Sequence, residues 1–140
     1  MIKKKIFDKI GYFNPNFNII GDFDLIMKIA KNFNAHSTND SLIFYRYHKN
    51  NFSKLNTEMF FNEFNEWYKN KNQLKDKNFL DNIEFFKKKL LSLEISNLLI
   101  NENKNFYLFN KILNYPVSLK KIKYFVAFFM PKILTNYLRK

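Results

Sequence analysis

The sequence contains no cysteine, and only two glycines and three prolines occur among its 140 residues. Without cysteine the chain has no disulfide framework, no thiol nucleophile and no thiolate metal site. A turn-dense sandwich or barrel is disfavoured, because such folds need turn residues at regular spacing. Arginine is also scarce, since Arg46 and Arg139 are the only two among 24 basic residues. Arginine makes most bidentate contacts to bases and phosphates, so its scarcity argues against nucleic-acid binding despite a formal net charge of +12.

Long apolar runs are missing too. The longest, over residues 124–130, is far shorter than the ~20 residues needed to span a bilayer. The basic start of the chain is not followed by the apolar stretch of a signal peptide. We therefore expect a cytoplasmic protein. What the sequence does contain is 46% hydrophobic residues, with 18 Phe and 8 Tyr, which is enough for one folded domain with a core.

Up to about residue 54 the chain alternates between helix and strand signals. Apolar residues three and four positions apart predict short helices over residues 2–10 and 22–31. Between them, the Asn14-Pro15 pair predicts a turn-rich loop. β-Branched and aromatic residues predict two short strands, over residues 36–38 and 41–48, which we expect to pair as a β-hairpin.

From about residue 55 onward the periodicity is helical. Large apolar side chains predict helices over residues 57–74, 81–100 and 106–113, followed by a basic segment over 118–140 that Pro131 interrupts. Packing between helices explains these aromatic stripes. The predicted fold class is α+β, predominantly helical, with a short β-hairpin and about five helices. Residues 1–54 form one predicted part, and residues 55–140 form a helical extension with a basic amphipathic tail.

Two polar places in the first part are not required by packing. Asp22 and Asp24 flank Phe23 at the start of the second predicted helix. Acids in a first helical turn are stabilised by the helix dipole and cap free N–H groups, so a purely structural role also explains them. Arg46 and His48 lie where the second predicted strand runs into a polar loop, where a histidine can simply be exposed. The residue patterns leave both kinds of role open.

Several weak motifs follow one another in a recognisable order. They are a glycine-aromatic turn after a basic-apolar helix, an acidic helix start, a basic residue one turn later, and a strand end followed by Asn and Ser. In this sequence they are Gly11-Tyr12-Phe13, Asp22-Phe23-Asp24-Leu25, Lys28, Tyr45-Arg46-Tyr47-His48, Asn51 and Ser53. An acid ahead of Trp67, Glu63 or Glu66, also fits. In this order they resemble the C-terminal half of a family 2 glycosyltransferase with the GT-A fold.

The resemblance implies a role for each motif. In that family the acid at the helix start is the general base, which takes the proton of the acceptor hydroxyl as it attacks the anomeric carbon of a nucleotide sugar; the matching residue is Asp22. The reaction implied is transfer of a hexose to a surface polysaccharide or lipid-linked glycan. The remaining residues would position the acceptor or its loop (Asp24 and Lys28), hold the donor diphosphate or its metal (His48 and Arg46), and complete the loop (Asn51 and Ser53).

The donor-binding half of such an enzyme has no counterpart in this sequence. Its Asp-x-Asp metal motif closes a buried strand, whereas Asp22-Phe23-Asp24 opens a helix. The resemblance therefore predicts a fragment, or a subunit whose N-terminal half is a separate chain. A divalent metal, Mg²⁺ or Mn²⁺, is expected only in the complete enzyme.

The C-terminal basic segment has an amphipathic pattern. Lysines surround aromatic and aliphatic residues, as in helices that lie among lipid headgroups. The pattern predicts peripheral binding to an anionic membrane, at the inner face of the cell membrane, through Lys120, Lys121, Lys123, Phe125, Phe129 and Lys132. Packing of the two phenylalanines on the preceding helices is the alternative. For the whole chain, the alternative function is a non-catalytic or degenerate helical module that docks on a membrane or on another transferase.

Overall fold

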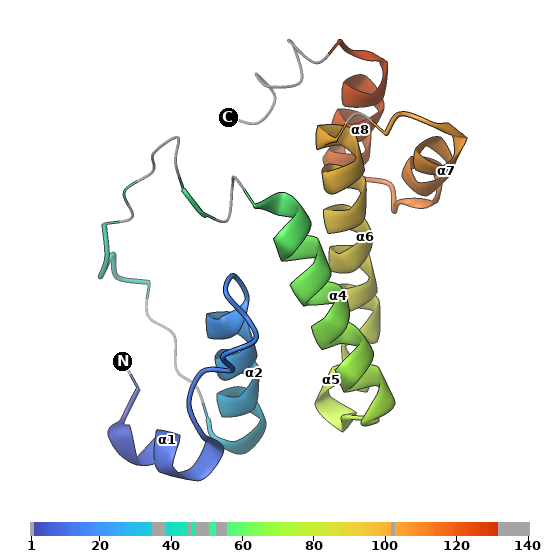
Figure 1. Cartoon of the computed structure of the whole chain (residues 1–140). Helices are drawn as coiled ribbons and strands as arrows, with labels where there is room; N and C mark the ends of the chain where they lie inside the picture. The colour runs from blue at the N-terminus through green and yellow to red at the C-terminus, as the bar shows by residue number, and fades with distance from the viewer. Residues whose placement is uncertain are drawn as a thin grey trace. The chain divides into compact units, whose positions relative to one another are not determined.

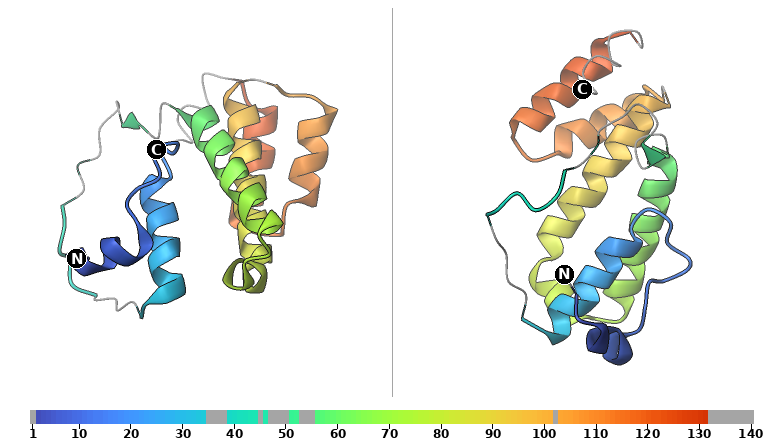
Figure 2. Two further views of the ribbon diagram at one scale, coloured as in Figure 1. Left: turned by 60° about the horizontal axis from the view of Figure 1, so that its bottom comes forward. Right: turned by 90° about the vertical axis from the view of Figure 1, so that its left-hand side faces the viewer.

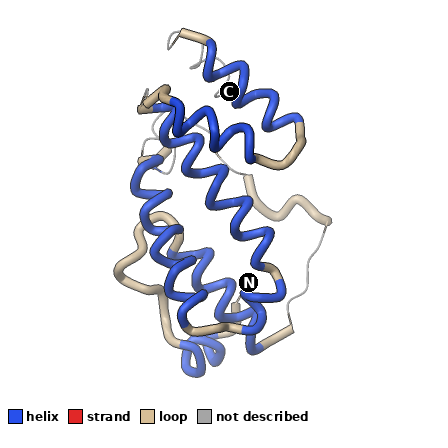
Figure 3. Tube along the Cα trace, turned by 90° about the vertical axis from the view of Figure 1, so that its right-hand side faces the viewer, coloured by secondary structure: helices blue, strands red, loops and turns tan. Residues whose placement is uncertain are grey.

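The computed structural model describes residues 2–34, 39–44, 46, 51–52, 56–101 and 103–131 (Figures 1 and 2). These residues contain α-helices and no strand, so the predicted helical character is confirmed (Figure 3). The chain divides into two compact units, Met1–Asn70 and Lys71–Lys140. The helices of the described residues are α1 Lys4–Ile10, α2 Gly21–Asn32, α4 Thr57–Gln73, α5 Lys77–Asp81, α6 Ile83–Ile100, α7 Phe106–Asn114 and α8 Leu119–Phe129.

In the first unit, α2 contacts α1 and also packs on α4. The contact with α4 is made by a cluster of three aromatic rings, Phe23 of α2 with Phe64 and Trp67 of α4, whose centroids lie 4.9–5.7 Å apart. Ile20 and Leu25, each only 2% exposed, complete this core. The predicted stripe of aromatic residues in α4 therefore faces a core, as the spacing indicates.

In the second unit, α6, α7 and α8 lie side by side (Figures 1 and 2). Polar side chains fix where α7 and α8 begin: Asn105 accepts from Leu108 N–H at 2.9 Å, and Ser118 accepts from Lys121 N–H at 3.3 Å. The core that they enclose consists of the buried residues Ile95, Leu108, Ile112, Tyr115 and Tyr124.

The predicted β-hairpin is not confirmed. Residues 36–38, 45 and 47–48 of the two predicted strands lie outside the described residues, whereas residues 41–44 and 46 are described and have no strand conformation. The side chains of Leu42, Ile43 and Phe44 are 74%, 84% and 103% exposed. Their β propensity depends on packing against a sheet or core, and an isolated hairpin is marginal in water. The described part of the chain supplies no such surface for them.

Two predicted helix boundaries also change. The helix expected over residues 81–100 begins at Ile83, because a separate short helix, α5, precedes it. The side chain of Asp76 accepts from Phe79 N–H and starts α5. In the basic tail, α8 ends at Phe129, just before Pro131, and residues 132–140 lie outside the described residues.

Candidate functional site at the start of α2

The loop that leads into α2 is held by one buried carboxylate. Glu63, on α4, accepts hydrogen bonds from the backbone N–H groups of Asn18, Ile19 and Ile20 at 2.8, 2.9 and 3.1 Å. Burial alone would raise the pKa of Glu63, but these backbone donors outweigh it and hold the pKa below its ordinary value. Glu63 therefore fixes the chain immediately before α2 as a buried anion.

The second acid of α2, Asp24, is also buried and paired. Only 4% of the residue is exposed. One carboxylate oxygen accepts from the indole N–H of Trp67 at 3.1 Å, and the other lies 2.7 Å from the ammonium group of Lys28. The structure thus brings together two of the predicted site residues, Asp24 and Lys28, as an ion pair within α2, and the bond from Trp67 connects the same carboxylate to α4.

The first acid, Asp22, has a different environment. It is exposed, and its carboxylate accepts a hydrogen bond from the N–H of the next residue, Phe23, at 2.7 Å. The next two residues of the motif are held by the core: Phe23 packs on the ring of Trp67, and Asp24 is buried. The helix turn that carries Asp22 is therefore fixed, while the Asp22 carboxylate faces solvent. An exposed carboxylate on a fixed helix start can accept a proton from a bound hydroxyl group.

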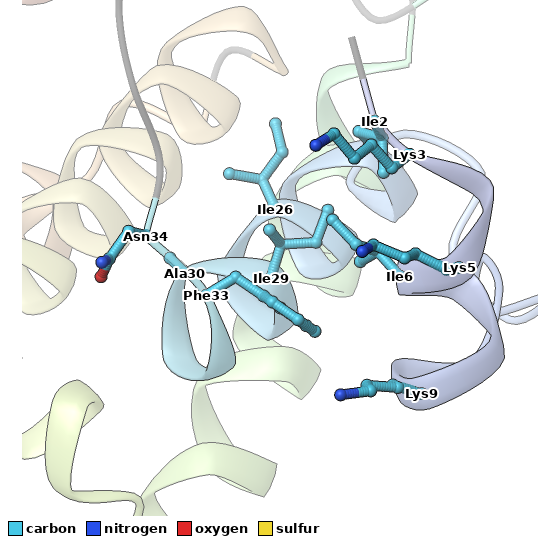
Figure 4. Close-up of a pocket in the computed structure, with 10 residues that line it drawn as sticks. All are labelled: Ile2, Lys3, Lys5, Ile6, Lys9, Ile26, Ile29, Ala30, Phe33 and Asn34. Carbon is cyan, nitrogen blue, oxygen red and sulfur yellow. The ribbon is translucent and has the colours of Figure 1, made fainter.

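An apolar groove runs between α1 and α2 (Figure 4). Its volume is about 670 Å³, and isoleucines from both helices line it, with Lys3, Lys5 and Lys9 of the α1 side around them. On α2, Ile26 and Ile29 of this groove follow Asp22 at intervals of four and three residues, so the three lie on one face of the helix.

The predicted donor-side residues are only partly described. Arg46 is exposed in a segment without regular secondary structure, and Asn51 is half-buried. His48 and Ser53 lie outside the described residues.

The residues predicted for the tail separate into two groups. Phe125 packs against Phe109 of α7, with ring centroids 6.0 Å apart, whereas Phe129 is 74% exposed. Lys120 donates to the Ser92 hydroxyl at 2.6 Å and Lys121 to the Leu113 carbonyl at 2.5 Å.

The other two lysines predicted for the tail are Lys123 and Lys132. Lys123 is exposed on α8, and Lys132 lies outside the described residues. No helix in the described ranges is long and apolar enough to cross a bilayer.

A divalent metal site at the start of α2 would need carboxylates that point toward one another. Asp22 and Asp24 do not converge, because Asp24 is turned into the core and neutralised by Lys28. Among the residues that the structure describes, no group of three or more His, Asp or Glu side chains could hold a metal ion. Asp22 and Asp24 therefore do not form a divalent-metal site by themselves.

The sequence pattern predicts an acid ahead of Trp67, either Glu63 or Glu66, but no role for it. The pattern of charge could not distinguish Glu63 from Glu66, which is exposed in the structure. The available signal was position: Glu63 falls beside Phe64 and one turn before Trp67, on the apolar side of α4.

Comparison of the chain with protein-family models, with curated proteins and with solved structures finds no match. The site at the start of α2 therefore rests on the residues and on their geometry.

Proposed function

We propose that the chain is the acceptor-side part of a family 2 glycosyltransferase of the GT-A fold, with Asp22 as general base. The observation that carries the proposal is the contrast between the two acids at the start of α2. Asp24 is buried against Trp67 and Lys28, while Asp22 is exposed on the same fixed turn. A general base needs both a fixed position and access to its substrate.

The proposed reaction transfers a hexose from a nucleotide sugar to a glycan hydroxyl. The hydroxyl oxygen forms a bond to the anomeric carbon, the bond from that carbon to the diphosphate breaks, and Asp22 takes the hydroxyl proton. The nucleoside diphosphate leaves with the electron pair of the broken bond. Asp24 and Lys28 act as positioning residues, because the buried carboxylate of Asp24 holds the turn that carries Asp22 and Lys28 pairs with that carboxylate.

The donor half of the reaction lies outside this set of residues. The nucleotide-binding part is proposed to lie elsewhere in the protein or on a partner chain, because the sequence has no Asp-x-Asp motif at the end of a buried strand. His48, Arg46, Asn51 and Ser53 are proposed to meet the donor there, with Mg²⁺ or Mn²⁺ bound by that other part. The exposed apolar side chains of Leu42, Ile43 and Phe44 agree with a segment that packs on another surface.

The test is a single exchange of the proposed base in the cells that make the protein. Asp22→Asn removes the basic oxygen and keeps the size of the side chain. Transfer of labelled hexose from nucleotide sugars to extracted glycans should fall by about 10²–10⁴-fold, the usual contribution of general-base catalysis. Asp81→Asn, which removes an exposed carboxylate on α5, should leave transfer unchanged. Transfer at the normal rate in the Asp22→Asn cells would contradict the proposal.

The alternative, a non-catalytic docking module, is favoured by a separate observation. The α7–α8 hairpin exposes large apolar side chains that the transferase proposal does not use. Deletion of the chain decides between the two functions: a transferase subunit is required for the glycan, whereas a docking module is not required for the chemistry of transfer.

A further inference from the structure

One side of α8 is apolar and faces away from the core. The residues on it are spaced three, four and three positions apart, which places them in one stripe along the helix. Tyr124 and Ala127, the buried residues of α8, point in another direction. The members of the stripe and their exposed fractions are Leu119 at 81%, Ile122 at 60%, Val126 at 41% and Phe129 at 74%.

A second exposed stripe lies on α7, and one ring contact joins the two. Phe109 of α7 meets Phe125 of α8 with centroids 6.0 Å apart. On α7, Phe106 and Leu113 lie three residues before and four residues after Phe109, and are 82% and 47% exposed. On α8, Ile122 and Phe129 have the same spacing around Phe125. We define the hairpin face as the exposed side chains of the two stripes together with the half-buried pair that joins them: Phe106, Phe109, Leu113, Ile122, Phe125 and Phe129.

The hairpin face is bordered by positive charge. Lys121 donates to the carbonyl of Leu113, and Lys104 donates to the carbonyl of Met130, the residue after Phe129. Lys123 lies on α8 between Leu119 and Val126 in the helical register. In sequence, residues 103–140 contain eight Lys or Arg and no Asp or Glu.

We propose that the hairpin face binds the surface of a membrane that contains anionic lipids, with its apolar side chains among the acyl chains and its lysines at the headgroups. An exposed apolar surface bordered by lysines, on helices that contain no Asp or Glu of their own, is the composition that such a membrane surface attracts. The proposal is independent of the transferase function, because it involves neither Asp22 nor the groove beside α2.

Charge also distinguishes a lipid surface from a second copy of the chain. Two hairpin faces packed on each other would bring two sets of lysines together with no carboxylate from residues 103–131 to compensate them. An anionic bilayer supplies the opposite charge and accepts apolar side chains at the same time. The face also uses Phe106 and Leu113 of α7, which the sequence pattern of the tail did not include.

The experiment is flotation of the full chain with vesicles. One set is phosphatidylcholine alone, and the other mixes about three parts phosphatidylcholine with one part phosphatidylglycerol. The protein should float with the anionic set, and added salt should release part of it. Ile122→Glu with Phe129→Glu should reduce the bound fraction at least about tenfold. Leu74→Glu, at a site 75% exposed but outside the hairpin, is the matched control and should bind like the unaltered protein.

Charge and insertion are measured separately. Lys123→Gln should weaken anionic binding about fivefold, whereas Lys88→Gln, on α6, should not. Phe129→Trp should give fluorescence that shifts to the blue on adding anionic vesicles and is quenched by brominated acyl chains, and Leu74→Trp should not.

Two outcomes would overturn the proposal. One is unchanged flotation of the Ile122→Glu, Phe129→Glu protein. The other is a dimer in sedimentation equilibrium that the same double variant dissociates, together with no binding to anionic vesicles, because the hairpin face would then belong to self-association. A change in the Asp22→Asn transfer assay bears on neither outcome.

Discussion

The indole N–H of Trp67 donates to the carboxylate of Asp24 across 43 residues of sequence, and both side chains are buried. The other oxygen of Asp24 pairs with Lys28, so one carboxylate ties α2 to α4 and also neutralises a lysine of its own helix. Such a buried anion is tolerated only while its partners remain in place. The start of α2 is therefore fixed by tertiary contacts and by the neighbouring anchor Glu63.

Removal of the Asp24 carboxylate should destabilise the first unit. Asp24→Ala takes away the acceptor of a buried N–H and the partner of Lys28, and we expect a loss of about 1–3 kcal/mol in unfolding free energy. Asp22→Ala, two residues earlier and exposed, should cost less than about 1 kcal/mol. Urea unfolding followed by the fluorescence of Trp67, the one tryptophan of the chain, measures both. Equal losses for the two variants would contradict the structural distinction between the two acids.

Glu63 should make the stability of the first unit dependent on acid. Its pKa is lowered in the folded chain, so the unfolded chain binds a proton first as pH falls from the ordinary value of 4.5. Stability is therefore full above that pH and is lost as pH falls toward the lower pKa of the folded state. Glu63→Gln should cost about 1–3 kcal/mol at neutral pH and flatten this dependence. Glu66→Gln, an exposed control on the same helix, should retain it; the comparison needs urea titrations across the acid range.

The helices could be predicted because their signal is local. Phe64 and Trp67 of α4, for example, fall on the side of the helix that the periodicity marks as apolar. The partners of Asp24 and Glu63 on other segments could not be predicted, because Trp67 and the loop before α2 lie 43 to 45 residues away from them and no periodicity connects them. The sequence signal of an acid at a helix start does not distinguish a buried carboxylate, such as that of Asp24, from an exposed one, such as that of Asp22.

The basic tail shows a second limit of sequence patterns. Phe125 and Phe129 lie on one apolar side of the predicted helix, yet the structure packs the first against Phe109 and leaves the second exposed. α8 is apolar over more of its circumference than a single core contact covers. Which part is covered depends on where α6 and α7 meet it, and that is a tertiary property.

A buried tyrosine hydroxyl in the second unit should matter more than an exposed one. The Tyr124 hydroxyl lies 2.8 Å from the Ser92 hydroxyl and donates to the Ser92 carbonyl at 3.1 Å, inside the core. Tyr124→Phe should cost about 0.5–1.5 kcal/mol, with the thermal midpoint followed by circular dichroism. Tyr107→Phe removes a bond to Glu94 on a residue that is 52% exposed, and should change stability by less than about 0.5 kcal/mol. A larger effect at Tyr107 would mean that the hydroxyl of Tyr124 is not held as described.

The two glycines of the chain should respond to alanine in opposite directions. Gly11 ends α1 with φ 78° and ψ −179°, a backbone region open almost only to glycine, so Gly11→Ala should cost about 1–3 kcal/mol although no atom lies within 4 Å of the added methyl group. Gly21 begins α2 in a helical conformation, and a Cβ there would meet Phe13 at an ordinary contact distance of 3.8 Å. Gly21→Ala should therefore be neutral or stabilising by up to about 1 kcal/mol, because alanine loses less backbone entropy on entering a helix. Urea unfolding of the two variants, followed by Trp67 fluorescence, measures the difference. If Gly11→Ala were as stable as the unaltered protein, the turn that separates α1 from the loop before α2 would not have the backbone described here.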